Sequence, residues 1–335
     1  MAAANVKDVA ALAGVSLGTV SNVLNRPEIV SPETADRVMQ AIEKLGFVRN
    51  DAARQLKAGR SNTIGLVVLD VRNPFFTDLA RGAEDGAGAA GLSILLGDSG
   101  RSHERETAYL DLFEEQRVHG VLVSPLSDVA RRLEGLRRRG IPAVLVDRSG
   151  TGSGFSSVSV DDVAGGRLAV EHLISIGRRR IAYLAGSFDF SQVTDRLRGA
   201  REAVASHPGT TLEVIDIGGL TVLEGRAAGE RIVARAADDR PDGIFTANDL
   251  IAVGVLQALV MQSDIRVPGD VALVGYDDID FAQTAVVPLS SVRQPSALLG
   301  RTAVEILLDE ARDPTLQPRQ IVFQPELVIR ASTVP

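Results

Sequence analysis

The chain has 335 residues, of which 45% are hydrophobic and 24% are charged, a composition typical of a globular protein with two or three domains. It contains no cysteine, which excludes disulfide scaffolds, thiolate metal sites, iron–sulfur clusters and cysteine nucleophiles. Its formal net charge of −7 at pH 7, taken as a whole, argues against a nucleic-acid partner.

The charge is unevenly distributed along the chain. Residues 1–60 contain eight Lys and Arg against six Asp and Glu, a net charge of +2, and include all three lysines. The remaining residues contain 28 basic and 37 acidic side chains, a net charge of −9. The first residues, MAAANVKDVA, lack the apolar core of a signal peptide, and no run of ~18 apolar residues follows. We therefore expect a soluble, cytoplasmic protein without a membrane partner.

Residues 5–58 are predicted to form short helices joined by tight turns. We expect three helices, the first capped by Asn5, the second by Ser16 and the third by Ser31. Gly14 and Gly46 are predicted to end the first and third helices. The apolar positions with helical spacing are Val6, Val9, Ala10 and Ala13 in the first helix, Val20, Val23 and Leu24 in the second, and Ala35, Val38, Ala41 or Ile42, and Leu45 in the third.

The first two predicted helices have the spacing of a helix-turn-helix. Ala10 is a small residue where two helices would touch, and Gly14 would lie in the turn. Val20 and Val23 would fix the second helix onto the first, so that its exposed side could enter a major groove of DNA. A small helical bundle with the same turn is an alternative interpretation of this spacing alone.

From residue 62 onward, apolar stretches rich in β-branched residues alternate with helical stretches. This alternation predicts parallel sheets covered by helices on both faces. The predicted strands are 64–69, 93–96, 121–124, 143–146, 157–160, 181–184, 213–217, 244–246, 271–275 and 322–330. The segment is too long for one such sheet, so we expect two doubly wound lobes with a crossing near Val160.

The sequence from NVKDVAALAGVSLGTVSNVLN to GRSNTIGLVV closely resembles the start of the LacI/GalR family of bacterial transcription regulators. The resemblance continues in order through NPFF (73–76), VDR (146–148), Arg196 with Gly199, AND (247–249), GYDD (275–278) and Gln294. It implies an α/β fold in which a small all-α helix-turn-helix head (1–49) and a hinge helix with linker (50–61) precede a core (62–335) similar to periplasmic sugar-binding proteins. The N-lobe is expected at about 62–159 and 293–321, and the C-lobe at about 160–292 and 322–335.

The resemblance implies that the second helix reads DNA bases through Leu17, Gly18 and Asn22, which occupy the family's specificity-determining positions. Asn22 can both donate and accept hydrogen bonds, which suits an adenine edge, whereas Leu17 offers apolar contact. The polar residues expected to contact phosphates or cap the helix are Ser16, Thr19, Ser21 and Asn25.

Residues 50–58 resemble the family's hinge helix, which orders on DNA. Leu56 matches the leucine that inserts between central base pairs, a step that kinks the duplex. Arg54 and Lys57 are placed for phosphates, and Ala53 for close backbone approach. Leu56 could alternatively be a core leucine, but this segment has too few apolar residues for a helix standing alone.

Two doubly wound lobes joined by crossing strands place a ligand in the cleft between them. The residues that match the family's positions for a small-molecule effector are Asn73, Phe75, Phe76, Asp147, Arg148, Arg196, Asn248, Asp277 and Gln294. Phenylalanine rings can cover the apolar face of a sugar, and the polar groups can pair with its hydroxyls. Because the set resembles a ribose-binding pocket, a pentose or another monosaccharide is the expected effector. Val160, and Phe188 or Phe190, are further candidates for the lining.

Structural roles are the alternative for individual members of this set. Asp277 could cap a strand end, Arg148 could pair with Asp147, and Gln294 could make a hinge hydrogen bond. The arginines could also bind a phosphorylated sugar or another anionic metabolite.

The sequence therefore predicts a repressor that binds a near-palindromic operator as a homodimer, because two heads would contact two half-sites. The chain ends soon after the last predicted strand, without a heptad extension, which favours a dimer over a tetramer. No cofactor, metal or enzymatic activity is expected, since the four histidines lack metal-ligand spacing and no catalytic constellation is found. The G-x-G-x-x-G at 86–91 ends a helical stretch, so we interpret it as helix packing. A sugar-binding module without DNA function and a doubly wound enzyme are the alternatives.

Overall fold

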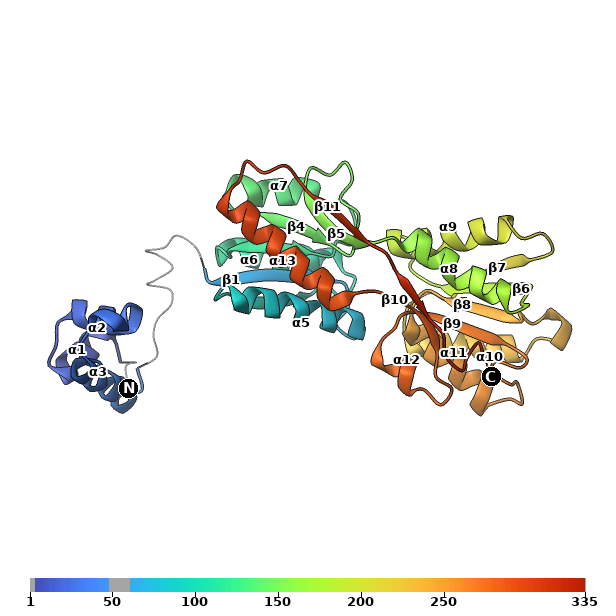
Figure 1. Ribbon diagram of the computed structural model, residues 1–335, viewed down its shortest axis with the longest axis horizontal. Helices are drawn as coiled ribbons and strands as arrows, with labels where there is room; N and C mark the ends of the chain where they lie inside the picture. Colours follow the sequence, from blue (N-terminus) through green and yellow to red (C-terminus); the bar gives the residue numbers. More distant parts are fainter. Residues whose placement is uncertain (1–3, 48–60, 335) are drawn as a thin grey trace. The chain divides into compact units, whose positions relative to one another are not determined.

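A computed structural model describes residues 4–47 and 61–334 (Figure 1). The chain divides into two compact units, Met1–Arg60 and Ser61–Pro335, which we call the head and the core. Within the described ranges, no helix is long and apolar enough to cross a membrane. The hinge residues predicted from the sequence, Ala53, Arg54, Leu56 and Lys57, lie outside the described residues.

The described part of the head contains helices α1 (Val6–Ala13), α2 (Leu17–Asn25) and α3 (Pro32–Leu45), with a short 3-10 helix, η1 (Pro27–Ile29), between α2 and α3. Asn5 caps α1 in a reciprocal capping box with Asp8, and Gly14 ends the helix in the left-handed region at φ 65°. Ser16 caps α2 by accepting a hydrogen bond from the backbone N–H of Thr19.

The three helices of the head enclose a small apolar core, formed by Val9, Ala10, Ala13, Val20, Val23, Val38 and Ala41. Two expectations were wrong. Val6 is 38% exposed, because it lies on the outer side of α1 rather than on its buried face. Ser31 does not cap α3 with its side chain, since its hydroxyl donates to the Thr34 hydroxyl instead.

The first lobe of the core, the N-lobe, is built on a six-stranded sheet of order β11-β5-β4-β3-β1-β2. Its strands, all paired in parallel, are β1 (Thr63–Val68), β2 (Ser93–Asp98), β3 (Gly120–Val123), β4 (Ala143–Val146), β5 (Ser156–Val160) and β11 (Gln320–Phe323). Its helices are α5 (Pro74–Ala89), α6 (His103–Glu115), α7 (Ala130–Arg138) and α13 (Ser296–Arg312).

The second lobe, the C-lobe, has a six-stranded sheet of order β12-β10-β9-β8-β6-β7. Its strands are β6 (Arg180–Ala185), β7 (Thr211–Asp216), β8 (Gly243–Thr246), β9 (Ala272–Asp277), β10 (Ser290–Arg293) and β12 (Glu326–Val328), which pairs antiparallel to β10. Its helices are α8 (Asp162–Ser175), α9 (Ser191–Ala205), α10 (Val222–Val233), η2 (Ala237–Asp239), α11 (Asp249–Met261) and α12 (Asp280–Thr284).

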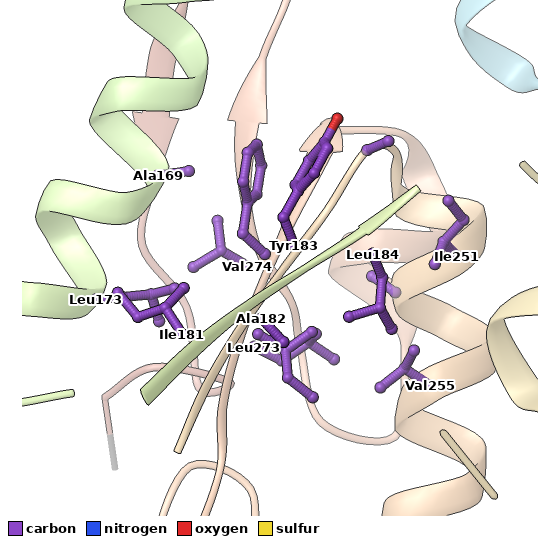
Figure 2. Packing of buried hydrophobic residues seen from close by; sticks show 14 of the residues in the cluster. Ala169, Leu173, Ile181, Ala182, Tyr183, Leu184, Ile251, Val255, Leu273 and Val274 are labelled. Atoms are coloured by element: carbon purple, nitrogen blue, oxygen red, sulfur yellow. The ribbon is translucent and has the colours of Figure 1, made fainter. Parts of the chain in front are cut away.

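The C-lobe sheet is covered on both faces, as its apolar strands require. Figure 2 shows Leu173 of α8 packed near Ile181 on one side of β6, while Leu184 faces Ile251 and Val255 of α11 on the other. Because both faces are buried, β6 is buried without alternation from Ile181 to Ala185, after the exposed Arg180 at its start.

The chain passes between the lobes from β5 to α8, from β10 to α13 and from β11 to β12 (Figure 1). The single strand predicted at 322–330 was wrong, because this stretch contains the last residues of β11 and then β12, which belong to different sheets. The polar strand β10 was not predicted.

Helices α5 and α13 of the N-lobe touch through glycines. A Cβ at Gly82 would lie 1.9 Å from the backbone oxygen of Ala297, and one at Gly300 would lie 2.0 Å from that of Leu79. A Cβ at Gly86 would meet Val304 at 3.3 Å, whereas one at Gly88 would meet nothing within 4 Å. Helix packing therefore explains Gly86 but not the whole run of glycines at 86–91.

Candidate functional site

The exposed face of α2 carries the residues that the sequence assigned to base readout. Leu17 is 46% exposed, and Gly18 and Asn22 are also exposed. Val20 and Val23 on the opposite face are buried against the rest of the head. One face of α2 is thus packed against the head, and the opposite face is exposed to a partner. Base readout by these residues stays a prediction.

The polar residues around α2 are connected to one another. Ser16 Oγ lies 3.1 Å from the backbone nitrogen of Thr19 and 2.9 Å from its hydroxyl. Asn25 Nδ2 donates to the backbone oxygen of Ser21 over 2.7 Å. Ser16 therefore has the capping role, and contact of these four residues with phosphates stays a prediction. The exposed basic residues of the described head are Lys7, Arg26, Arg37 and Lys44.

A cavity, partly open to solvent, lies between the two lobes of the core. Its lining includes eight of the nine residues expected to contact an effector: Asn73, Phe75, Phe76, Asp147, Arg196, Asn248, Asp277 and Gln294. These residues follow strands β1, β4, β8, β9 and β10 or lie on α5 and α9, so the carboxyl ends of the strands bring them together.

Arg148, the ninth residue of the expected set, does not line this cavity. Its side chain is half-exposed, and Nη1 donates to the backbone oxygen of Ser127 over 2.7 Å, beside a separate hollow of the N-lobe. The following turn of the chain thus directs Arg148 away from Asp147, which does line the cavity. Among the additional candidates, Phe190 lines the cavity, whereas Val160 and Phe188 do not.

Asp277 lies at the end of β9, where an amide from each side holds its carboxyl. Asn73 Nδ2 donates to Oδ2 over 2.9 Å, and Gln294 Nε2 donates to Oδ1 over 2.8 Å. Burial raises the pKa of Asp277, against the opposing effects of Arg196 and these two amides. Asn73 and Asn248 also cap helices, because Asn73 accepts from the N–H of Phe75 and Asn248 from that of Ile251.

Arg196 is buried, and protein groups hold its guanidinium. Nε donates to Asp162 over 2.7 Å, and Nη1 donates to the backbone oxygen of Ala247 over 2.6 Å. The guanidinium carbon lies 3.7 Å from the centre of the Tyr276 ring, a cation–π distance. Burial disfavours the charge, but Asp162 and the other surrounding groups raise the pKa of Arg196 above its ordinary value. The side chain therefore stays charged and fixed in orientation.

Asp147 follows β4 with a left-handed backbone at φ 59° and is buried. Gln192 Nε2 donates to its Oδ2 over 2.9 Å and to its backbone oxygen over 2.5 Å. Burial raises the pKa of Asp147 to about 8, with Asp162 and Asp277 adding to the rise and Arg196 opposing it. Asp147 is therefore largely protonated at neutral pH.

Two oxygen atoms of the lining lack a hydrogen-bond partner among the described residues, Asp147 Oδ1 and Gln294 Oε1. By contrast, the amide nitrogens of Asn73, Gln192 and Asn248 donate to protein oxygens. Buried polar atoms are nearly always hydrogen-bonded, so these two oxygens mark where polar groups of a ligand would bind.

An arginine pair surrounds Asp70, which also lines the cavity. Arg72, 71% exposed, forms a two-pronged pair with this carboxylate, and Arg101 lies 3.4 Å from it. Burial alone would raise the pKa of Asp70, but the hydrogen bonds from Arg72 and the charge of Arg101 lower it. One buried carboxylate thus balances one of the two positive charges here.

Sequence reasoning missed the lining residues Leu69, Asp70, Arg101, Gln192, Val193 and Leu220. Two of them carried a usable signal. Asp70 lies just beyond β1, three residues before Asn73. Gln192 precedes Arg196 by four residues, and this spacing places Gln192 and Arg196 on one face of α9. Among the described residues, no cluster of side chains could hold a metal ion.

Comparison with protein families matches both units. Residues 5–50 match the family model described as bacterial regulatory proteins, lacI family, and residues 170–333 match the periplasmic binding protein-like domain. The first match contains α1 to α3, and the second contains most of the C-lobe.

Relatives match over nearly the whole chain. The HTH-type transcriptional repressor PurR of Vibrio parahaemolyticus is 34% identical, with 98% of each chain covered. A structure of the transcriptional regulator CelR in complex with cellobiose is 34% identical, with a TM-score of 0.71 over 98% of this chain and 99% of that one. The lac repressor dimer bound to operator and the anti-inducer ONPF is 27% identical, with a TM-score of 0.85 and full coverage of both chains. The helix-turn-helix head, the two parallel-sheet lobes and the similarity to these relatives all indicate the same family. The chain belongs to the lacI family of bacterial regulatory proteins.

Proposed function

We propose that this protein is a repressor that binds a near-palindromic operator as a homodimer and is controlled by a small molecule in the cavity between its lobes. The observation that carries the proposal is the α2 surface, where readout residues are exposed on a helix whose other face is fixed in the head core. The operator-bound lac repressor dimer, similar over the full chain, supports the same use of the head.

The residues of α2 divide into two roles on DNA. Leu17, Gly18 and Asn22 read base edges, and Ser16, Thr19, Ser21 and Asn25 position the head on phosphates. A head with a net charge of only +2 binds weakly as a single copy, so two linked heads are needed for high affinity. Leu56 of the hinge would add the wedge between base pairs, supported by Arg54, Lys57 and the small Ala53.

The effector is proposed to be a neutral monosaccharide, such as a pentose. Of the two unpartnered oxygens of the lining, Gln294 Oε1 is an acceptor, and Asp147 Oδ1 donates when the carboxyl is protonated. Sugar hydroxyls both donate and accept, so they suit both atoms. An anionic metabolite is disfavoured because Arg196 is held by Asp162 and Arg101 faces Asp70. Phe75, Phe76 and Phe190 supply apolar surface for the face of a sugar ring. The cellobiose complex of a relative supports a sugar.

The proposed dimer uses the edge of the N-lobe. Strand β2 ends the sheet, and its Leu95 and Leu96 are 38% and 41% exposed. An unpaired edge strand with apolar side chains favours association with a second copy. A C2 pair formed here would present two heads to two half-sites.

Control follows from linkage between the two ligands. An effector that favours one arrangement of the lobes changes operator affinity, and operator DNA changes effector affinity by the same factor. The proposal assigns no enzymatic activity to the chain.

The effector proposal is tested by a thermal-shift screen against pentoses, hexoses and their phosphates, because a ligand of the native state raises the melting temperature. We expect a neutral sugar to stabilise the core and the matching sugar phosphate to do so less. Stabilisation by phosphorylated compounds alone would contradict the neutral effector while leaving DNA binding open.

A further inference from the structure

Two hydrogen-bonded pairs inside the core link the lobes in a reciprocal arrangement. Asn73 belongs to the N-lobe, and its Nδ2 donates to Oδ2 of Asp277 in the C-lobe over 2.9 Å. Gln192 belongs to the C-lobe, and its Nε2 donates to Oδ2 of Asp147 in the N-lobe over 2.9 Å. Each lobe contributes one carboxyl and one amide, and each carboxyl is held by the amide of the opposite lobe.

The two pairs are largely shielded from solvent. Asp147, Asp277 and Gln192 are only 5%, 7% and 8% exposed, and Asn73 is half-buried. Water therefore has little access to these hydrogen bonds while the lobes are together, least of all to the pair of Gln192 and Asp147. Separating the lobes would break the bonds and hydrate both carboxyls, so the pairs exist only in the closed arrangement and bias the equilibrium toward it.

The same pairs determine which atoms face the cavity. Both carboxyl oxygens of Asp277 are occupied, one by Asn73 and the other by Gln294. For Asp147, Gln192 occupies Oδ2 and leaves Oδ1 without a partner among the described residues. An entering molecule therefore meets one carboxyl oxygen whose orientation is fixed from the other lobe.

We propose that Asn73 and Gln192 form a latch that closes the lobes before an effector binds, and that Gln192 is the positioning residue for Asp147. A latched core offers a preformed site. The effector therefore binds with higher affinity, because its binding does not have to supply the free energy of closing the lobes. This inference depends neither on operator binding nor on the identity of the effector.

The absence of cysteine from the chain allows a direct test. Spin labels are attached to the full chain at Arg138→Cys on α7 and Arg198→Cys on α9, one exposed position in each lobe. The labelled chain is mixed with an excess of unlabelled chain, so that distances within one protomer are measured even in a dimer. Pulsed electron paramagnetic resonance then gives the distance distribution between the labels, with neither DNA nor sugar present.

Two substitutions break the latch in different ways. Gln192→Met removes the amide at similar side-chain length. Asn73→Asp keeps an oxygen that caps α5 at Phe75, but it places a second carboxyl against Asp277. Gln262→Met is the matched control, because the amide of Gln262 is exposed and donates to Glu230 within the C-lobe.

We expect one narrow distance population in the unsubstituted labelled chain and in the Gln262→Met control. Each latch variant should add a second population. The loss of one hydrogen-bonded pair should lower the ratio of closed to open molecules about tenfold. The combined variant should lower this ratio about a hundredfold, because both pairs act on the same equilibrium.

An unchanged single population in the combined variant would overturn the latch, as would a predominantly open population in the unsubstituted chain. Far-ultraviolet circular dichroism checks that each variant is folded. Gln192→Asn, whose shorter amide cannot reach Asp147 in the same position, replaces any variant that fails this check. Neither result would bear on the proposed function, since DNA and effector are absent.

Discussion

Replacement of Arg196 by Met should destabilise the core strongly, because the guanidinium is the buried partner of Asp162. The salt bridge is 2.7 Å long, and both side chains are less than 10% exposed. Met fills much of the same volume and restores neither the charge nor the hydrogen bond to the backbone oxygen of Ala247. Asp162 would then be left as a buried carboxyl without its main partner.

The expected loss follows from this uncompensated charge. Removing one member of a buried ion pair costs about 3–5 kcal/mol. With roughly 2–4 °C of melting temperature per kcal/mol for a domain of this size class, the midpoint should fall by about 10 °C.

Arg148→Met is the matched control, because the sequence assigned both arginines to the effector site and the structure separates them. Arg148 is half-exposed and donates one hydrogen bond to Ser127, so its loss should cost about 1 kcal/mol. Thermal unfolding by circular dichroism compares the two variants. Adding Asp162→Asn to Arg196→Met should restore part of the loss, because it removes the unpaired charge.

Equal shifts for Arg148→Met and Arg196→Met would refute the reasoning. A fall in melting temperature of less than about 2 °C for Arg196→Met would also refute it, because removing a buried guanidinium from its ion pair should cost about 3–5 kcal/mol.

Three further predictions concern the head, the cavity and the dimer. Asn22→Ala should weaken binding to a selected operator about tenfold to a hundredfold without altering the circular dichroism of the chain, as fluorescence anisotropy would measure; unchanged affinity would exclude Asn22 from base readout. Asp147, with its pKa raised to about 8, keeps in the native state a proton that the unfolded chain loses above about pH 4. Stability should therefore fall as pH rises from about 4 to 8, by up to about 1.4 kcal/mol per pH unit from this group, and urea unfolding of Asp147→Asn should show a shallower fall; identical slopes would contradict the assignment. Leu96→Asp should convert the proposed dimer to monomers in sedimentation experiments, and an intact dimer would rule out the β2 edge.

The periodicity of the sequence predicted most of the fold, and its exceptions have physical causes. Strand β10, Ser290–Arg293, was missed because its buried serines are polar. Ser290 bonds to Thr333 and Arg330 in the C-terminal segment, and Ser291 donates to Asp249, so a polar strand is satisfied by distant residues. The division of 322–330 between two sheets was invisible because a chain that crosses between lobes stays extended.

Motif order predicted the cavity better than it predicted individual side chains. Arg196 and Asp147 reach the cavity, whereas Arg148, next to Asp147 in the sequence, turns away to Ser127. The left-handed backbone of Asp147 sets this direction, and no pattern of residue types reports it. Gln192 was missed because its partner, Asp147, is 45 residues away and in the other lobe.

Selection of DNA from a random duplex pool tests the central claim most directly. The full chain and its Asn22→Ala variant are each used to enrich duplexes, which are then sequenced. A sequence-specific dimer should enrich a near-palindromic site with two half-sites, and the variant should lose preference at matching positions of both halves. Failure of the full chain to enrich any sequence, or enrichment of a single asymmetric site unaffected by Asn22→Ala, would contradict the account.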